Sequence, residues 1–372
     1  MNRLHRIPKE TCIAVAMSGG VDSSTTAAWL YDQGYKNIFG MTMHVYPLVE
    51  NGAVPESIAI TDAKKVSDSL GIPHYVLNVS KQFHEEIITN FRDEYAAGRT
   101  PNPCIRCNKW IKFTAMLDFA REHGAQYIAT GHYVKVEGDN PYYIRKAHDL
   151  SKDQSYFLSR LAQEQLSYIL TPLGYVNKTE TREIARRLNL FNADKAESQG
   201  ICFVKNTTYD KFVREDAAVE SPPGPIYDTN DKYLGEHHGL INYTVGQRRG
   251  FGLALGKPYY VVDIISDTNT LIIGDDSDLL RFGVKGSEFN WIYPESPCID
   301  EPIKARIRYR HTESPGRIIA VDGSSVRFVF DIPQRAITPG QQLVFYRDDT
   351  VLGSAVIEGS FDAARVQASA RE

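Results

Sequence analysis

The sequence contains no long apolar run and little cysteine. None of its apolar stretches approaches the roughly 18 residues needed to span a bilayer. The charged segment from Met1 to Glu10 has no apolar stretch of the kind found in secretory signals. The 372 residues include five cysteines, an odd number that argues against a disulfide scaffold and is typical of a reducing compartment. We therefore expect a cytoplasmic protein without membrane contact.

Two common nucleotide-binding motifs are also missing. No Gly-x-x-x-x-Gly-Lys-Ser/Thr motif is present, which excludes a P-loop kinase or GTPase site. The absence of Gly-x-Gly-x-x-Gly argues against a dinucleotide-binding fold. The net charge is only −4, so nucleic acid would have to be bound by local basic patches.

A glycine-rich turn is present near the start of the chain. The apolar run from Cys12 to Met17 predicts a buried strand, and Thr25 to Gln33 predicts a helix. Between them stands Ser18-Gly19-Gly20-Val21-Asp22-Ser23-Ser24. Glycines let the backbone approach a ligand, and the free N–H groups and dipole of the helix favour phosphate. Asp22 could cap the helix or hold a metal ion, and an ordinary strand-to-helix turn is the alternative.

The first half of the chain alternates between predicted strands and helices. We expect strands at residues 37–43, 75–79 and 127–130, and helices at residues 58–70, about 83–95, about 110–123 and up to Leu188. The last of these begins with a capping box formed by Asn177 and Glu180. This alternation indicates βαβ units and a parallel sheet, whose ligands bind at the carboxyl ends of the strands. Both Ser18 and Gly131 fall there.

After Pro222-Pro223-Gly224-Pro225, which we interpret as a linker, the pattern becomes β. Short apolar runs flank turn signals at residues 267–269, 322–323 and 348–349, which predicts a small barrel. The predicted class is thus α/β: a parallel-sheet domain at residues 1–215, a small β-rich central domain at 216–280 and a C-terminal β-barrel at 281–361. Residues 362–372 are expected to form a frayed tail.

A basic, proline-containing segment, Gly98 to Lys109, holds Cys104 and Cys107, and we expect it to be a loop. Arg99, Arg106 and Lys109 would favour the thiolate form of a nearby cysteine. Read alone, Cys-x-x-Cys indicates a redox pair or half a zinc site, but the chain has no second such motif and no two histidines separated by three to five residues. Cys202, read alone, is expected to be a buried core residue.

Six segments together resemble the tRNA-specific 2-thiouridylases, a family of PP-loop ATP pyrophosphatases. The segments are the glycine turn, 98–104, 129–133, 151–155, 198–203 and 243–250, and residues 336–341 extend the likeness. The resemblance runs from about residue 11 to 360. It implies the adenine nucleotide alpha hydrolase-like fold for the first domain, followed by a central domain and a barrel, in agreement with the pattern above.

The resemblance implies an enzyme that replaces the 2-oxygen of the wobble uridine in tRNA with sulfur. ATP would adenylate this oxygen, releasing pyrophosphate and then AMP, and Mg²⁺ is expected near Asp22. The ATP-binding residues carried over by motif are Ala16, Met17, Ser18, Gly19, Gly20, Val21, Asp22, Ser23, Met43 and Gly131. Sulfur would arrive from a donor protein, a cysteine desulfurase or a sulfur-relay protein, and we expect a monomeric enzyme.

Further roles follow from the same resemblance. Cys107 would be the nucleophile, and Cys202 would carry the sulfur as a persulfide. Such a transfer needs a second thiol to attack the persulfide, so two cysteines are the minimum. Asn102, Pro103 and Cys104 would contact the target base, although many family members have aspartate in place of Cys104. The remaining tRNA contacts would be His132, Lys152, Asp153, Gln154, Arg308, Tyr309 and Gln341.

Two other functions keep part of this pattern. A different PP-loop enzyme, one that amidates or ligates its adenylated substrate, would not need Cys107 and Cys202. A non-catalytic RNA-binding adaptor would not need the intact glycine turn. Arg306, Arg308 and Arg310 have the period of one strand face, about 6.6 Å apart, which suits backbone phosphates. The alternative for this face is a solvated surface of the barrel.

Overall fold

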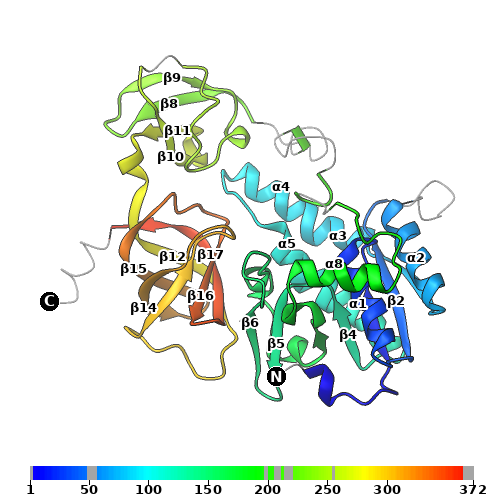
Figure 1. Ribbon diagram of the computed structural model, residues 1–372. Coiled ribbons are helices and arrows are strands. Elements are labelled where there is room, and N and C mark those ends of the chain that lie inside the picture. Colours follow the sequence, from blue (N-terminus) through cyan, green and yellow to red (C-terminus); the bar gives the residue numbers. More distant parts are fainter. Residues whose placement is uncertain are drawn as a thin grey trace.

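The computed structural model describes residues 3–47, 57–196, 200–204, 211–212, 221–253 and 256–362. Three sheets organise these residues (Figure 1): a parallel sheet of five strands, a sheet of four strands and a sheet of eight. Six strands of the last sheet close into a barrel, because β12 pairs with both β15 and β17. The predicted α/β class and the succession of three parts are confirmed. The expected boundary at 215–216 and residues 363–372 of the expected tail lie outside the described residues.

The five-stranded sheet has the order β3-β2-β1-β4-β7. Its strands are β1 (Ile13–Ala16), β2 (Ile38–His44), β3 (His74–Asn78), β4 (Tyr127–Thr130) and β7 (Ile169–Leu170). Side chains of β1 alternate between two apolar clusters: Ile13 and Val15 pack on one side and Ala14 on the other. Helices cover both faces, which explains why the central strand is apolar at every position.

The helices of this domain are short. They are α1 (Val21–Asp32), α2 (Ile58–Leu70), α3 (Ser80–Phe83), α4 (Thr89–Ala96), α5 (Pro103–Arg106), α6 (Met116–Glu122), α7 (Gln163–Ser167) and α8 (Lys178–Arg187). A π-helical turn, His84–Ile88, joins α3 to α4, and Phe83, Ile87, Phe91 and Tyr95 are buried along this unit as predicted. Within the described residues, no helix combines the length and the apolar character needed to cross a membrane.

The segment with Cys104 and Cys107 is helical, so the prediction of a loop as far as Lys109 is wrong. α5 contains Cys104 and continues into a π-helical stretch, Cys107–Ala115, and then into α6. We call residues 103–122 the cysteine helix. Pro103 is its first residue, a position where the N–H that proline lacks has no partner within the helix. The proline that we interpreted as stiffening a loop therefore begins a helix.

The second half of the chain is β, as predicted. The central sheet contains β8 (Gly224–Asp228), β9 (Tyr233–His237), β10 (Tyr260–Ile265) and β11 (Thr270–Gly274). The barrel contains β12 (Leu280–Trp291), β13 (Pro302–Arg306), β14 (Ser314–Asp322), β15 (Ser325–Arg335), β16 (Gln342–Arg347) and β17 (Thr350–Phe361). The hairpins expected around residues 322–323 and 348–349 are β14–β15 and β16–β17. Gly224 and Pro225, taken as part of a linker, begin β8 instead.

A hairpin from the first domain extends the barrel, which the sequence did not predict. It consists of β5 (Val134–Gly138) and β6 (Tyr142–Lys146), and β6 pairs with β17 (Figure 1). On β16, Leu343 and Phe345 point into the barrel core. Val344 and Tyr346 belong to the apolar cluster that contains Ala14 of β1. Because both faces of β16 are buried, its outer face packs into an apolar cluster of the α/β domain while its inner face belongs to the barrel core.

Candidate functional site

The glycine turn closes on itself after β1. Ser23 Oγ accepts the backbone N–H of Ser18 at 3.0 Å and donates to the carbonyl oxygen of Gly20 at 3.2 Å. Gly20 is the N-cap of α1 and makes no side-chain cap. The suggestion that Asp22 caps this helix is therefore wrong, since Asp22 lies within its first turn. The N–H groups at the start of α1 thus lack a capping side chain and suit an anion.

Two buried contacts fix Gly19. Its φ is +70°, and a Cβ atom there would lie 2.6 Å from the carbonyl oxygen of Ala59, so only glycine fits without strain. From the other side, Asn192 Nδ2 donates to the carbonyl oxygen of Gly19 at 3.2 Å, and Lys195 Nζ reaches the same oxygen at 3.3 Å. The turn is thus held between α2 and the segment after α8.

The residues expected to bind ATP meet at one edge of the sheet. Ala16 ends β1 and residues 17–23 follow it, Met43 is the penultimate residue of β2, and Gly131 directly follows β4. A Cβ atom on Gly131 would lie 2.8 Å from the backbone nitrogen of Ser23. Glycine at position 131 therefore lets the end of β4 touch the first turn of α1.

Asp22 is bound by two side chains that the sequence analysis did not select. Its Oδ1 atom accepts Lys178 Nζ at 2.6 Å and the hydroxyl of Tyr133 at 2.9 Å. Tyr133 OH also lies 2.9 Å from Thr181 Oγ1. The capping box of α8 is confirmed and sets Lys178 as the first helical residue. This capping box is the one sequence feature that could have indicated Lys178 as the start of a helix. It does not indicate that Lys178 contacts Asp22.

The three candidate thiols gather below the sheet. Cys107 is buried in an apolar cluster that also contains Phe203, whose ring lies 5.3 Å from that of Phe91. Phe203 thereby holds its neighbour Cys202 near the cysteine helix, and Cys202 itself is exposed. The expectation of a buried Cys202 is wrong. Ser198 and Gln199 of its motif lie outside the described residues.

Burial acts on the pKa of two of these thiols. It raises the pKa of Cys107 to about 12 and also raises the pKa of Cys104, which is solvent-exposed on the side away from the core. The thiols of Cys202 and Cys104 also raise the pKa of Cys107. The cation that opposes this shift is Lys112, one turn further along the cysteine helix.

The prediction that Arg99, Arg106 and Lys109 favour the thiolate is therefore wrong. Arg99 pairs with Glu94 and Glu358, Arg106 pairs with Glu86, and Lys109 lies 4.9 Å from the ring centre of Trp110. Lys112 carried no motif of its own. Lys112 acts on the pKa of Cys104 and Cys107 because all three residues belong to the cysteine helix.

His132 lies between the two parts of the site. It directly follows Gly131, which touches α1, and its Nδ1 is 2.8 Å from the hydroxyl of Thr130. Burial, with a contribution from Lys112, lowers the pKa of His132 well below its ordinary value, so the ring is neutral at pH 7. Lys112 thus acts on the pKa values of His132, Cys104 and Cys107, and the ring of its neighbour Phe113 lies 5.9 Å from that of His132.

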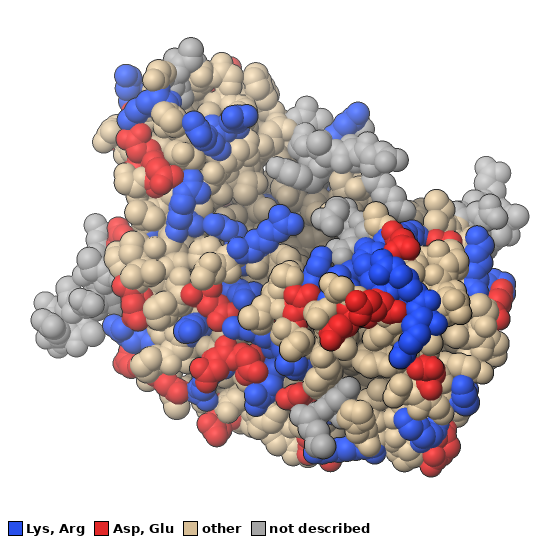
Figure 2. Space-filling view, in the orientation of Figure 1, with Lys and Arg blue, Asp and Glu red and all other residues tan. Residues whose placement is uncertain are grey.

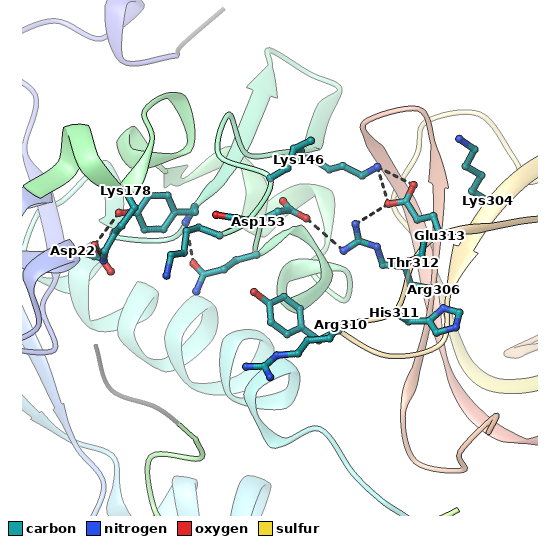
Figure 3. Close-up of a pocket in the computed structure, with 16 residues that line it drawn as sticks. Asp22, Lys146, Asp153, Lys178, Lys304, Arg306, Arg310, His311, Thr312 and Glu313 are labelled. Atoms are coloured by element: carbon teal, nitrogen blue, oxygen red, sulfur yellow. Dashed lines mark hydrogen bonds and ion pairs between the residues drawn. The ribbon is translucent and has the colours of Figure 1, made fainter. Parts of the chain in front are cut away.

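A pocket of about 870 Å³ opens between the α/β domain and the barrel. Asp22 and Lys178 line one end, and Arg306, Arg310 and Glu313 line the other (Figure 3). Six of the lining residues are cationic and three are anionic: Lys146, Lys152, Lys178, Lys304, Arg306 and Arg310 against Asp22, Asp153 and Glu313. Lys and Arg side chains border the hollow between these parts of the surface (Figure 2). The pocket therefore suits a phosphate-rich ligand.

Four expected tRNA contacts line this pocket: Lys152, Asp153, Gln154 and Tyr309. Asp153 is only 3% exposed, and its carboxylate accepts the backbone N–H groups of Ala147 and Ser155. Gln154 Oε1 accepts the backbone N–H of Tyr133 at 2.9 Å. Tyr309 packs its ring 4.4 Å from that of Phe157. These contacts shape the loop that carries Lys152.

The three arginines do not share a strand face, so that prediction is wrong. β13 ends at Arg306, and residues 307–311 form a turn. Arg306 pairs with Glu313 at 2.9 Å, while Arg308 Nη1 donates to the carbonyl oxygen of Arg335 at 3.3 Å. Arg310 is exposed and lines the pocket. Only Arg310 of the three is both exposed and turned to the pocket.

The remaining expected contacts lie at the start of the cysteine helix and on the barrel. Asn102 is the N-cap of α5 and Pro103 is buried, while Cys104 is exposed. Gln341 donates to the carbonyl oxygen of Thr100 at 2.8 Å, so it joins the barrel to the segment before the cysteine helix. Across the described ranges, no three His, Cys, Asp or Glu side chains are grouped closely enough to hold a metal ion.

Family models match most of the chain. A model described as a tRNA methyl transferase HUP domain matches residues 11–206, and the PRC-barrel model of the same series matches 210–275. An aminomethyltransferase β-barrel model matches 282–357. A tRNA-specific 2-thiouridylase MnmA of Acetivibrio thermocellus is 45% identical over 358 residues, covering 93% of this chain and 99% of that protein. The chain belongs to the tRNA-specific 2-thiouridylase family.

Further 2-thiouridylases agree with this membership. The one of Carboxydothermus hydrogenoformans is 45% identical over 357 residues, covering 93% of this chain and 97% of that protein. The one of Halothermothrix orenii is 44% identical over 358 residues, covering 94% and 99%. The family models are named after methyl transfer, whereas these relatives are named for thiolation.

Proposed function

We propose that this protein is a tRNA 2-thiouridylase, which adenylates the 2-oxygen of the wobble uridine and replaces it with sulfur. The observation that carries the proposal is the row of contacts from the glycine turn to the thiols. Gly131 touches Ser23, His132 follows, and the ring of His132 lies 5.9 Å from that of Phe113 on the cysteine helix. A base held beside His132 would lie within reach of both halves of the reaction.

ATP fits the glycine turn. The N–H groups of α1 would hold its phosphates, and Lys178 would supply the positive charge that a P-loop takes from its own lysine. Asp22 would hold Mg²⁺, which neutralises phosphate charge when it is bound. Phosphate would then replace Asp22 as the partner of Lys178. Such a site favours cleavage between the α and β phosphates.

The cysteines would carry out the sulfur step. The outer sulfur of a persulfide on Cys202 forms a bond to C2 of the base, and the C2–O bond breaks with its electron pair leaving on AMP. The Cys107 thiolate then attacks Sγ of Cys202. The S–S bond breaks with its electrons remaining on the base as the new thiocarbonyl, and a Cys107–Cys202 disulfide forms. A thiol reductant restores the two thiols, and a donor protein reloads Cys202.

The pocket between the domains would bind the tRNA. Lys152, Arg310 and Tyr309 would contact the RNA, while Asp153 would hold the loop, because its buried carboxylate is already satisfied by backbone N–H groups. Arg308 and Gln341 would bind RNA only if they gave up bonds to backbone carbonyl oxygens. Asn102, Pro103 and Cys104 would meet the target base at the start of the cysteine helix.

Labelled ATP tests the first half of this proposal. The protein is incubated with ATP labelled in the α phosphate, with and without unmodified tRNA, and the products are separated. We expect AMP that depends on tRNA. Accumulation of ADP, or AMP formed equally well without tRNA, would contradict the proposal.

A further inference from the structure

The segment just before the cysteine helix lies where all three parts of the protein meet. Gly98 has φ +70°, and a Cβ atom there would lie 2.6 Å from Cγ2 of Ile264 in the central sheet. The backbone N–H of Thr100 donates to the carbonyl oxygen of Pro339 at 2.9 Å. The side chain of Gln341 donates to the carbonyl oxygen of Thr100 at 2.8 Å. Both ends of this short segment are thus held by other domains.

Arg99 is the charged centre of this junction. Its Nε donates to Glu94 at 2.8 Å, and its Nη1 and Nη2 donate to the two carboxylate oxygens of Glu358 at 2.5 and 3.1 Å. Glu94 belongs to α4 and Glu358 to β17. The side chain of Arg99 is only 19% exposed. A two-pronged ion pair fixes orientation as well as distance, although its Glu358 partner is 41% exposed.

The chain between Arg99 and Cys104 is short and stiff. Pro101 and Pro103 have fixed φ angles, and α5 begins at Pro103. Few free backbone angles remain to absorb a displacement of Arg99. The position of the junction therefore sets where the cysteine helix begins.

The two half-reactions depend differently on this position. Sulfur transfer needs reacting atoms about 3–3.5 Å apart, and an error of about 1 Å can cost about a hundredfold in rate. Adenylation uses the glycine turn, Asp22 and Lys178, none of which contacts Arg99 among the hydrogen bonds and ion pairs described here. A shift of the cysteine helix would thus slow one step and spare the other.

We propose that Arg99, clamped by Glu358, is a positioning residue that holds the cysteine helix so that sulfur transfer follows ATP cleavage. This inference rests on the proposed function, and it assigns to the Gly-Arg-Thr-Pro-Asn-Pro segment a role beyond contact with the base. The competing explanation is that Arg99 only stabilises the domain interface.

The first experiment measures 2-thiouridine formed per AMP released, at saturating tRNA, for the wild type, Arg99→Gln and Glu358→Gln. The matched control is Arg145→Gln, since Arg145 also makes an interdomain ion pair, with Asp349 at 3.3 Å, far along the sequence from the cysteines. We expect the ratio to fall about fivefold or more in the first two variants and to stay unchanged in the control. An equal loss of both products, or a loss shared by Arg145→Gln, would overturn the inference.

The second experiment does not depend on turnover. The rate of alkylation of Cys107 is measured without tRNA by peptide mass spectrometry, alongside the melting temperature. We expect faster alkylation in Arg99→Gln and Glu358→Gln than in Arg145→Gln at equal melting temperature. Unchanged alkylation would overturn the inference even if the wild type forms 2-thiouridine. If the wild type forms none, the proposed function fails, while the alkylation rates still decide the role of Arg99.

Discussion

Lys178 Nζ lies 2.6 Å from Oδ1 of Asp22, although the two residues are 156 positions apart in the chain. The lysine begins α8 and the aspartate lies in the first turn of α1. Only 12% of the lysine side chain is exposed. The pair brings a cation to a phosphate-binding turn that has none of its own, and the account of ATP cleavage depends on it.

Replacing Lys178 with methionine should weaken the binding of ATP and leave the binding of AMP almost unchanged. A charge-assisted hydrogen bond contributes about 1.5–3 kcal/mol, so the Kd for a non-hydrolysable ATP analogue should rise about tenfold or more. The Kd for AMP should change little, because the β and γ phosphates are missing. Calorimetry measures both, and Lys64→Met, on an exposed lysine paired with Asp68, is the control. Equal losses for ATP analogue and AMP would contradict the assignment.

Asp22→Ala should abolish AMP formation while the protein remains folded. Tyr133→Phe removes only the hydroxyl that binds Asp22, so a milder loss of about fivefold in the rate of AMP release is expected from one hydrogen bond. Tyr175→Phe, which loses a similar bond to Glu137, should leave that rate unchanged. Circular dichroism checks the fold. A fully active Asp22→Ala would exclude the role given to this carboxylate.

Features encoded by neighbouring residues were predicted well. The strand, glycine turn and helix near the start of the chain were predicted because one short segment contains all the signals, although the helix begins at Val21 and not at Thr25 as expected. The capping box at Asn177 and the β14–β15 turn at Asp322-Gly323 were predicted for the same reason. The helix, the capping box and the hairpin turn depend on hydrogen bonds between residues only a few positions apart.

Features that depend on distant partners were missed or wrong. Lys178 and Lys112 became candidates only when folding placed them beside Asp22 and Cys107. The even spacing of Arg306, Arg308 and Arg310 suggested a strand, but the chain turns after Arg306, which pairs with Glu313. Proline is common both in stiff loops and in the first turn of a helix, so Pro103 alone could not show which of the two it occupies.

The alkylation of Cys107 should rise with pH. Burial raises the pKa of this thiol to about 12, above its ordinary value of 9.0, so the folded protein keeps it protonated. The rate, measured without tRNA by peptide mass spectrometry, should climb about tenfold per pH unit from pH 8 to 10, because only the thiolate reacts. Lys112→Met should lower the rate further. A plateau below pH 9 would show that the thiol is already ionised.

The same shift has a consequence for stability. A thiol whose pKa is higher in the folded than in the unfolded state stabilises the fold when it is protonated, at pH values below its unfolded pKa near 9. That contribution is lost as the pH rises from about 9 towards 12. Cys107→Ala should therefore make unfolding less sensitive to pH across this interval than it is in the wild type.

Arg310 and Arg306 should differ in their effect on tRNA binding. Arg310 is exposed at the pocket, so Arg310→Ala should weaken binding and reduce the salt dependence by about one phosphate contact. Arg306 is engaged with Glu313 and Asp153, so Arg306→Ala should mainly lower the melting temperature. Arg308→Ala tests the contact implied by the family resemblance. The test is the tRNA affinity of each variant measured from low to moderate salt. If the slope of affinity against salt concentration is unchanged in Arg310→Ala, this residue only belongs to a solvated surface.

Nucleoside mass spectrometry tests the central claim most directly. Unmodified tRNA is incubated with ATP, a persulfide donor and the wild type, Cys107→Ser, Cys202→Ser or Cys104→Asp, then digested and analysed. The account predicts 2-thiouridine with the wild type and none with Cys107→Ser or Cys202→Ser. It predicts substantial product with Cys104→Asp, because aspartate is common at this position in the family. No 2-thiouridine with the wild type, or undiminished product with Cys107→Ser, would contradict it.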